Sequence, residues 1–117
     1  MSAESVAHRW MACFNQADLE GLLSLYAEDA THYSPKLKVR QPETNGLIFG
    51  KQALRLWWAD AFLRLPKLHY RLTSVTPCQE RVFIEYVREN PGDPDMLVAE
   101  VFELNHGLIQ ASRVYHG

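Results

Sequence analysis

Glu100 interrupts the apolar segment 96–102 and is the residue of this sequence best suited to proton transfer. If the segment is a strand whose alternate side chains face a core, Glu100 points inward together with Val98. Burial disfavours the ionised form of a carboxyl group and raises its pKa. Glu100 is therefore a candidate general acid, general base or neutral hydrogen-bond donor. The structural alternatives are an exposed edge position or an ion pair with Arg88 or Arg71.

His32 and His116 are two further candidates for proton transfer, because histidine titrates close to neutral pH. The plainer interpretation of each is a satisfied polar residue on a strand, and His116 lies next to the C-terminal residue, where chains often fray. With Glu100 they could bind a divalent cation, since imidazole and carboxylate groups are common metal ligands. Their spacing matches no known metal motif, and the sequence has no glycine-rich phosphate loop. We therefore expect neither a metal nor an organic cofactor.

The elements that must position these groups follow from the hydrophobic spacing. Apolar residues recur at helical intervals in the segments 4–17, 19–26 and 51–65. Strand patterns, separated by turns rich in Gly, Pro and Asn, cover the segments 30–34, 68–75, 81–89, 96–104 and 108–116. Helices first and strands later are typical of an α+β fold in which helices pack on one face of a mostly antiparallel sheet.

The segment 35–50 is predicted to be a long loop, because it contains Pro35, Pro42 and an Asn45-Gly46 turn signal. Loops of this length in small domains often cover a functional site. Its lysines and arginine are expected to be solvated. Arg88 and Glu89 lie beside another turn and are also expected to be surface charges.

Composition narrows the class of protein. The 117 residues are 47% hydrophobic and 22% charged, as expected for one globular domain over residues 1–117. The net charge of -2, without a long basic run, argues against nucleic acid as a partner. No apolar segment is long enough to span a membrane and the N-terminal residues lack a signal-peptide pattern, so we expect a cytoplasmic protein. Cys13 and Cys78 are expected to stay reduced.

Several short motifs occur in a characteristic order over nearly the whole chain. They are the segments 15–22 and 26–31, the segment 49–54, and the segment 100–104 followed by 106–109. In this order the chain resembles the nuclear transport factor 2-like superfamily, specifically its SnoaL-like and ketosteroid-isomerase-like branch. The resemblance implies a cone-shaped fold, in which a curved sheet wraps around three N-terminal helices and leaves a largely apolar pocket. The superfamily contains both enzymes and binding proteins, so the fold does not decide the function.

The resemblance also carries over catalytic positions. Ketosteroid isomerase uses an Asp base with an oxyanion hole made of a Tyr and a protonated Asp. The Tyr position corresponds to Trp10 in this chain, the base position to Ser34 and the protonated Asp position to Glu100. Indole is a poor acid, and a serine without a partner is no base at neutral pH. The resemblance therefore does not extend to steroid isomerase activity.

The register of the family strands implies that His32, Ser112 and His116 point toward the same cavity as Glu100. One of Trp57 and Trp58 is expected to face this cavity and the other to lie at its flank. The expected ligand is an apolar small molecule, bound by Trp10, Phe14, Tyr33, Ser34, Trp57, Trp58, Phe62, Tyr86, Phe102 and Ser112. The resemblance further implies a homodimer through the outer sheet face, where Arg113 and Tyr115 are expected.

Two functions fit these features. One is cofactor-free acid–base catalysis (isomerisation, cyclisation, dehydration or hydrolysis) with Glu100 transferring the proton and a histidine assisting. The other is a non-enzymatic ligand-binding or protein-interaction module. The resemblance implies one minor alternative, because a branch of the superfamily hydrolyses epoxides with an arginine and two carboxylates around a water. Glu85, Arg88 and Glu100 are the residues that could take those parts.

Overall fold

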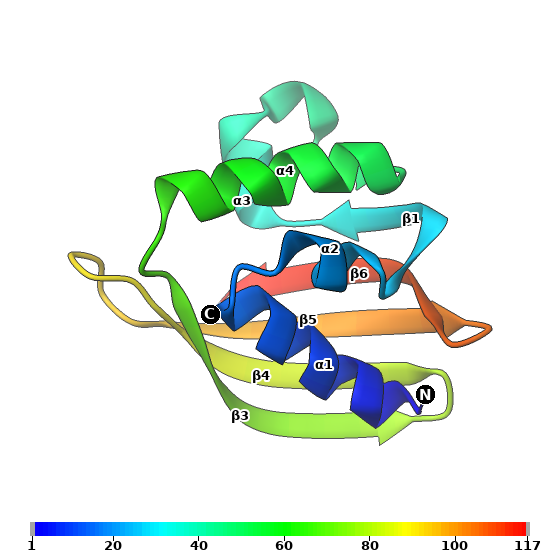
Figure 1. The fold of residues 1–117 in the computed structure, drawn as a ribbon. Coiled ribbons are helices and arrows are strands. Elements are labelled where there is room, and N and C mark those ends of the chain that lie inside the picture. Colours follow the sequence, from blue (N-terminus) through cyan, green and yellow to red (C-terminus); the bar gives the residue numbers. More distant parts are fainter. Residues whose placement is uncertain (1, 117) are drawn as a thin grey trace.

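A computed structural model describes residues 2–116 and contains four α-helices, one short 3-10 helix and six strands in that part of the chain (Figure 1). The elements in chain order are α1 (Ala3–Asn15), α2 (Leu19–Leu23), β1 (Tyr26–Tyr33), α3 (Pro35–Arg40), η1 (Pro42–Thr44), β2 (Leu47–Phe49), α4 (Lys51–Arg64), β3 (His69–Cys78), β4 (Arg81–Glu89), β5 (Met96–Asn105) and β6 (Leu108–His116). The predicted α+β class is confirmed. No helix within these residues is long and apolar enough to cross a bilayer.

The six strands form one sheet in the order β2-β1-β6-β5-β4-β3, and every neighbouring pair is antiparallel except β1 and β6. Irregularities in register occur in β3 between Leu72 and Ser74 and in β5 between Glu103 and Leu104. Such irregularities bend and twist strands. The sheet therefore curves around the helices: α1 packs on β3 and β4, and α4 packs on β1 and β2 (Figure 1).

The predicted helix over residues 19–26 is too long, and the predicted strand over 30–34 is too short. Asp18 does cap α2, because its Oδ1 accepts from the backbone N–H of Gly21 at 3.0 Å. The helix ends at Leu23, and Tyr26 already pairs with Ile109 of β6. The carbonyl of Leu25 accepts from the backbone N–H of Ile109 at 2.8 Å. Pairing with β6 therefore replaces the last predicted helical turn.

The predicted loop over residues 35–50 is wrong, because this segment contains α3, η1 and β2. Ser34 caps α3 by accepting from the backbone N–H of Lys36 at 3.2 Å, and Pro35 occupies the first turn. Proline is favoured there, since its missing N–H would have no helical partner. Gly46 precedes β2 with φ +88°, where a Cβ would lie 2.7 Å from the ring of Tyr33. The resemblance implied three helices, which correspond to α1, α2 and α4. The short helix α3 is an additional fourth one.

Candidate functional site

A cavity of about 400 Å³ lies between the concave face of the sheet and the helices. Its wall contains six Trp, Tyr and Phe side chains and the buried carboxyl group of Glu100. Among the predicted site residues, those that line it are Trp10, Phe14, His32, Ser34, Trp57, Trp58, Tyr86, Glu100 and His116. Trp57 and Trp58 both face the cavity and are both buried, so the prediction that only one of them would do so is wrong.

Four predicted ligand-binding residues lie outside the wall of this cavity. Phe62 packs edge-on against Phe14 with ring centroids 5.2 Å apart, and Phe102 lies behind Trp10 at 5.2 Å. Tyr33 alternates with His32 on β1, so its ring packs instead beside the turn at Gly46. The fourth residue, Ser112, is completely buried behind His32. These four side chains support the wall and do not form it.

Within the part of the chain that the structure describes, Glu100 carries the only carboxyl group of the cavity wall, and it is 1% exposed. The hydroxyl of Tyr86 donates to its Oε1 at 2.8 Å, whereas its Oε2 has no hydrogen-bond partner among residues 2–116. Burial raises the pKa of Glu100 to about 8, and the bond from Tyr86 offsets part of that shift. At pH 7 the carboxyl is therefore mostly protonated. Because Oε1 accepts from Tyr86, the proton of the neutral carboxyl resides on Oε2.

Both structural alternatives for Glu100 are wrong. The side chain is buried rather than at an exposed edge. Neither predicted arginine partner pairs with it: Arg88 contacts Asp93 at 3.4 Å, and Arg71 contacts Glu89 at 3.3 Å.

A second buried polar cluster, here called the relay, consists of Trp10, Tyr26, Ser112 and His32. The indole Nε1–H of Trp10 donates to the hydroxyl oxygen of Tyr26 at 3.0 Å. The hydroxyl groups of Tyr26 and Ser112 are 3.0 Å apart, and Ser112 Oγ lies 2.7 Å from Nδ1 of His32. The indole can only donate, so every proton is used if Tyr26 donates to Ser112 and Ser112 donates to His32.

With this direction of hydrogen bonding, Nδ1 of His32 is an acceptor. An accepting Nδ1 leaves the proton of a neutral imidazole on Nε2. Burial lowers the pKa of His32 to about 3, so the ring stays neutral through the physiological range. Its ring also packs on Trp58, with centroids 5.1 Å apart. In the cavity wall His32 is therefore suited to donate a hydrogen bond from Nε2 rather than to take up a proton.

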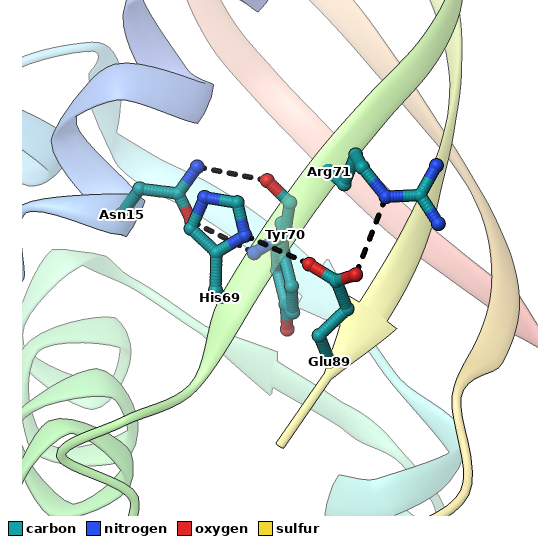
Figure 2. A network of polar contacts seen from close by, with 5 residues as sticks. All are labelled: Asn15, His69, Tyr70, Arg71 and Glu89. Atoms are coloured by element: carbon teal, nitrogen blue, oxygen red, sulfur yellow. Dashed lines mark hydrogen bonds and ion pairs between the residues drawn. The ribbon is translucent and has the colours of Figure 1, made fainter. Parts of the chain in front are cut away.

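Tyr70 is part of the cavity wall and was missed by the sequence analysis. Its ring stacks on Phe14 at 4.2 Å and on Tyr86 at 4.3 Å. Figure 2 shows how its backbone is held: the side-chain amide of Asn15 accepts from the N–H and donates to the carbonyl of Tyr70, both at 2.8 Å. This pair of bonds ties β3 to the end of α1. On the outer side of β3, His69 and Arg71 contact Glu89 (Figure 2).

Arg88 is buried in the cavity wall, so the prediction that it would be a surface charge is wrong. Alternation along β4 places Arg88 on the same face as Ile84 and Tyr86, so its side chain points toward the cavity. Asp93, in the loop after β4, contacts it there. Lys36, Arg40 and Arg64 also line the cavity.

The two minor chemical alternatives are not supported by the geometry. Among residues 2–116, no three His, Cys, Asp or Glu side chains gather closely enough to hold a metal ion. The epoxide-hydrolase arrangement is also wrong. Ile84 is the β4 residue that pairs with Glu100, and its neighbour Glu85 is exposed on the opposite face of the sheet.

Comparisons with known proteins agree on the type of fold. The sequence model of the SnoaL-like domain matches residues 7–112. A SnoaL-like protein of unknown function from Burkholderia thailandensis superposes with a TM-score of 0.88 at 24% identity, covering 98% of this chain and 93% of that one. A candidate ketosteroid isomerase from Kribbella flavida gives 0.81 at 16% identity, covering 98% and 77%. A candidate polyketide cyclase from Sinorhizobium meliloti gives 0.79 at 14% identity, covering 95% and 94%. No curated protein matches the chain.

Proposed function

The chain belongs to the SnoaL-like domain family, and from this premise we propose that it is a one-domain protein that binds an apolar small molecule in its cavity and transfers a proton with Glu100. The observation that carries the proposal is that Glu100, a residue of the cavity wall, has a buried Oε2 that lacks a partner among the described residues. Leaving a buried polar atom unpaired costs about 1–3 kcal/mol. A ligand atom at this position would remove that cost.

The chemistry follows from the two protonation states of this carboxyl. Below its pKa of about 8, Glu100 donates from Oε2 to a ligand oxygen and acts as a general acid. The ionised fraction, which grows as pH rises through that value, removes a proton from an acidic C–H group. Isomerisation, cyclisation and dehydration share this proton transfer. The aromatic wall would hold the apolar body of the ligand so that the reacting carbon stays near Glu100.

Hydrogen–deuterium exchange tests this function without knowledge of the natural substrate. 2-Tetralone, a bicyclic ketone with an acidic C–H group, would be incubated in D₂O and its deuterium content followed by NMR. We expect the protein to accelerate exchange, with a rate that rises through about pH 8, the pKa of Glu100. Glu100→Gln should lower the catalysed rate by about a hundredfold or more.

The matched control is Glu80→Gln, which makes the same chemical change at an exposed glutamate in the β3–β4 turn. It should exchange at the wild-type rate. Equal rates for wild type and Glu100→Gln would remove Glu100 from the mechanism.

A non-enzymatic ligand-binding protein is the second candidate function. It is favoured by the two groups that correspond to catalytic positions of ketosteroid isomerase. The indole N–H of Trp10 is used by Tyr26, and the hydroxyl of Ser34 caps α3. Saturable binding of the ketone without accelerated exchange would favour this function over catalysis.

We further propose a homodimer through the outer face of the sheet. Phe83, Leu97 and Tyr115 expose large apolar side chains there, on three adjacent strands. Arg113→Glu combined with Tyr115→Ala should shift sedimentation toward the monomer. Leu63→Ala, at an exposed apolar position on α4, should leave sedimentation unchanged. If the double variant sediments like wild type, another surface forms the contact or the protein is monomeric.

A further inference from the structure

The cavity wall is much more positive than the chain as a whole. The full sequence has a formal net charge of -2. Among residues 2–116, four cationic side chains nevertheless line the cavity, Lys36, Arg40, Arg64 and Arg88, and the one carboxyl group is that of Glu100, which is mostly protonated at pH 7. A cavity with low-dielectric walls concentrates such a field on whatever enters it.

The protein's own carboxylates neutralise only part of this charge. Arg40 and Arg64 share one exposed carboxylate, Asp60, at 3.7 and 2.7 Å. Arg88 has a single contact, from Nη1 to Asp93 at 3.4 Å. Lys36 has no carboxylate within 4.0 Å among residues 2–116.

Lys36, Arg88 and His116 form a cluster, here called the basic cluster, at one end of the cavity. The pKa of His116 is lowered by burial and by the charges of Lys36 and Arg88. The pKa of Lys36 is likewise lowered by burial and by Arg88, although Asp93 opposes this. Basic groups that repel one another in this way are stabilised by an anion placed among them.

Arg88 makes the cluster more than a solvated surface patch. Its side chain is 9% exposed, yet within the described residues its guanidinium donates to one oxygen only, Oδ2 of Asp93. The guanidinium carries further N–H donors in a fixed plane that matches a carboxylate or a phosphate. A buried charge with donors to spare is costly unless a partner supplies acceptors.

The basic cluster lies toward the start of β5, whereas Glu100 lies near the middle of that strand. Arg88 pairs with Met96 on β5, four positions before Glu100, which corresponds to roughly 13 Å of strand. His116 pairs with Val98, two positions before Glu100. Tyr86 lies on the same face of β4 as Arg88 and also pairs with Val98, so a ligand that reaches both Arg88 and Glu100 would pass Tyr86.

We propose that the ligand of this cavity is an apolar ring system carrying an anionic oxygen group, a carboxylate or a phosphate, which the basic cluster binds while the opposite end of the ring system contacts Glu100. This inference rests on the proposed function of the cavity as a small-molecule site. It names the chemical class of the ligand and its orientation.

Matched bicyclic probes test the inference. 2-Naphthoate carries the anionic group, 2-naphthamide is its neutral counterpart of nearly the same shape, and 2-naphthyl phosphate is the alternative anion. Affinities would be measured by quenching of tryptophan fluorescence, since Trp57 and Trp58 line the cavity. We expect at least one anion to bind about tenfold or more tightly than the amide, because a charge-assisted hydrogen bond contributes about that factor. The ratio of the affinities for 2-naphthoate and 2-naphthyl phosphate shows whether the site prefers a carboxylate or a phosphate.

Variants locate the effect. Lys36→Gln, at an exposed position of α3, should lower anion affinity about tenfold and leave amide affinity unchanged. Lys38→Gln, on the same helix but outside the cavity wall, should change neither. Arg88→Met should lower anion affinity in the same way as Lys36→Gln. Arg88 is buried, so this substitution could prevent folding. In that case the result for Lys36→Gln decides the test.

The failures of the two proposals are distinguishable. Equal affinity for the anions and the amide would overturn the anionic ligand while leaving a small-molecule site in place. Equal loss of anion binding in Lys36→Gln and Lys38→Gln would place the anion outside the basic cluster and also overturn it. If none of the probes binds, both the anionic ligand and the proposed small-molecule function are wrong for ligands of this shape.

Discussion

Two buried polar clusters lie in or behind the wall of the same cavity, and they differ in how completely they are hydrogen-bonded. In the relay, the chain from Trp10 through Tyr26 and Ser112 to His32 uses each buried donor and acceptor. In the other cluster, Tyr86 satisfies one oxygen of Glu100 and leaves the second unpaired among residues 2–116. A satisfied network is explained by folding alone. An unsatisfied buried carboxyl is a cost to folding, and such costs are concentrated at functional sites.

The clusters also oppose each other in their dependence on pH. The pKa of Glu100 is raised to about 8 from 4.5. The contribution of its protonated carboxyl to the free energy of unfolding is therefore complete below pH 4.5 and is lost as pH rises through 8. The pKa of His32 is lowered to about 3 from 6.5, so its stabilising effect is complete above pH 6.5 and is lost as pH falls through 3. Between pH 4.5 and 6.5 the two slopes cancel. Stability with respect to these groups is therefore highest on that plateau and falls on both sides.

The largest expected effect is on the alkaline side of the plateau. Glu100→Gln cannot ionise, so the loss of unfolding free energy between about pH 6.5 and 8 should disappear. A change in the pKa of Glu100 from 4.5 to about 8 corresponds to about 5 kcal/mol of unfolding free energy between those two pH values. Urea unfolding of wild type and variant at intervals from pH 5 to 9 measures the difference. Glu80→Gln should keep the wild-type alkaline slope, and parallel curves for wild type and Glu100→Gln would contradict the assignment.

His32→Asn is the reciprocal variant and acts on the acid side. It removes the imidazole that must stay neutral, so the free energy of unfolding should rise as pH falls from 6.5 to 4.5, where the wild type is level, and should no longer fall between pH 4.5 and 3. The difference from wild type should reach about 5 kcal/mol over the whole range. Its alkaline slope should remain, because Glu100 is unchanged. Urea unfolding from pH 3 to 7 tests this. If the variant loses the alkaline slope instead, the two clusters are not independent.

A smaller difference separates the hydrogen bonds of the two clusters at pH 5.5, where both titratable groups are neutral. Ser112→Ala leaves Tyr26 without an acceptor and His32 without a donor, and should cost roughly 3 kcal/mol. Tyr86→Phe removes one bond from a group that is already incompletely paired, and should cost about 1 kcal/mol. It should also raise the pKa of Glu100 further, since that bond lowers it. Urea unfolding at pH 5.5 measures both losses of unfolding free energy. Equal losses for Ser112→Ala and Tyr86→Phe would contradict the proposed difference between the two clusters.

The sequence predicted the acid cluster better than the relay. Glu100 is readable because a carboxyl interrupts an apolar run, and alternation then places it on the same face as Val98. Tyr26 was assigned to a helix, so its contacts with Trp10 and Ser112 could not be foreseen. These partners lie 16 and 86 positions away in the chain. Local spacing contains no information about contacts at such separations.

The basic end of the cavity was missed for two different reasons. Ser34-Pro35 is a sequence signal for the start of a helix, and using it would have placed Lys36 on α3. Arg88 carried a different signal, because it alternates with Ile84 and Tyr86 along β4 and so belongs to the inward face of that strand. Its place beside a turn, where charges are normally exposed, was weighed instead. The alternation of the strand therefore predicts the side of Arg88, whereas its closeness to a turn does not.

The smallest expected effect concerns the tautomer of His32, that is, which ring nitrogen carries the proton. If Tyr26 donates to Ser112 and Ser112 donates to His32, Nδ1 of His32 accepts and its proton lies on Nε2. Nitrogen-15 NMR of the wild type at pH 6 should therefore show one tautomer, with the proton on Nε2. Trp10→Phe removes the donor that begins the chain, so Tyr26 gains freedom to donate or accept and the tautomers should mix. Phe14→Leu, a change at a neighbouring wall position outside the relay, should keep the single tautomer. A proton on Nδ1 in the wild type would reverse the direction of the relay, and His32 would then present an acceptor to the cavity instead of a donor.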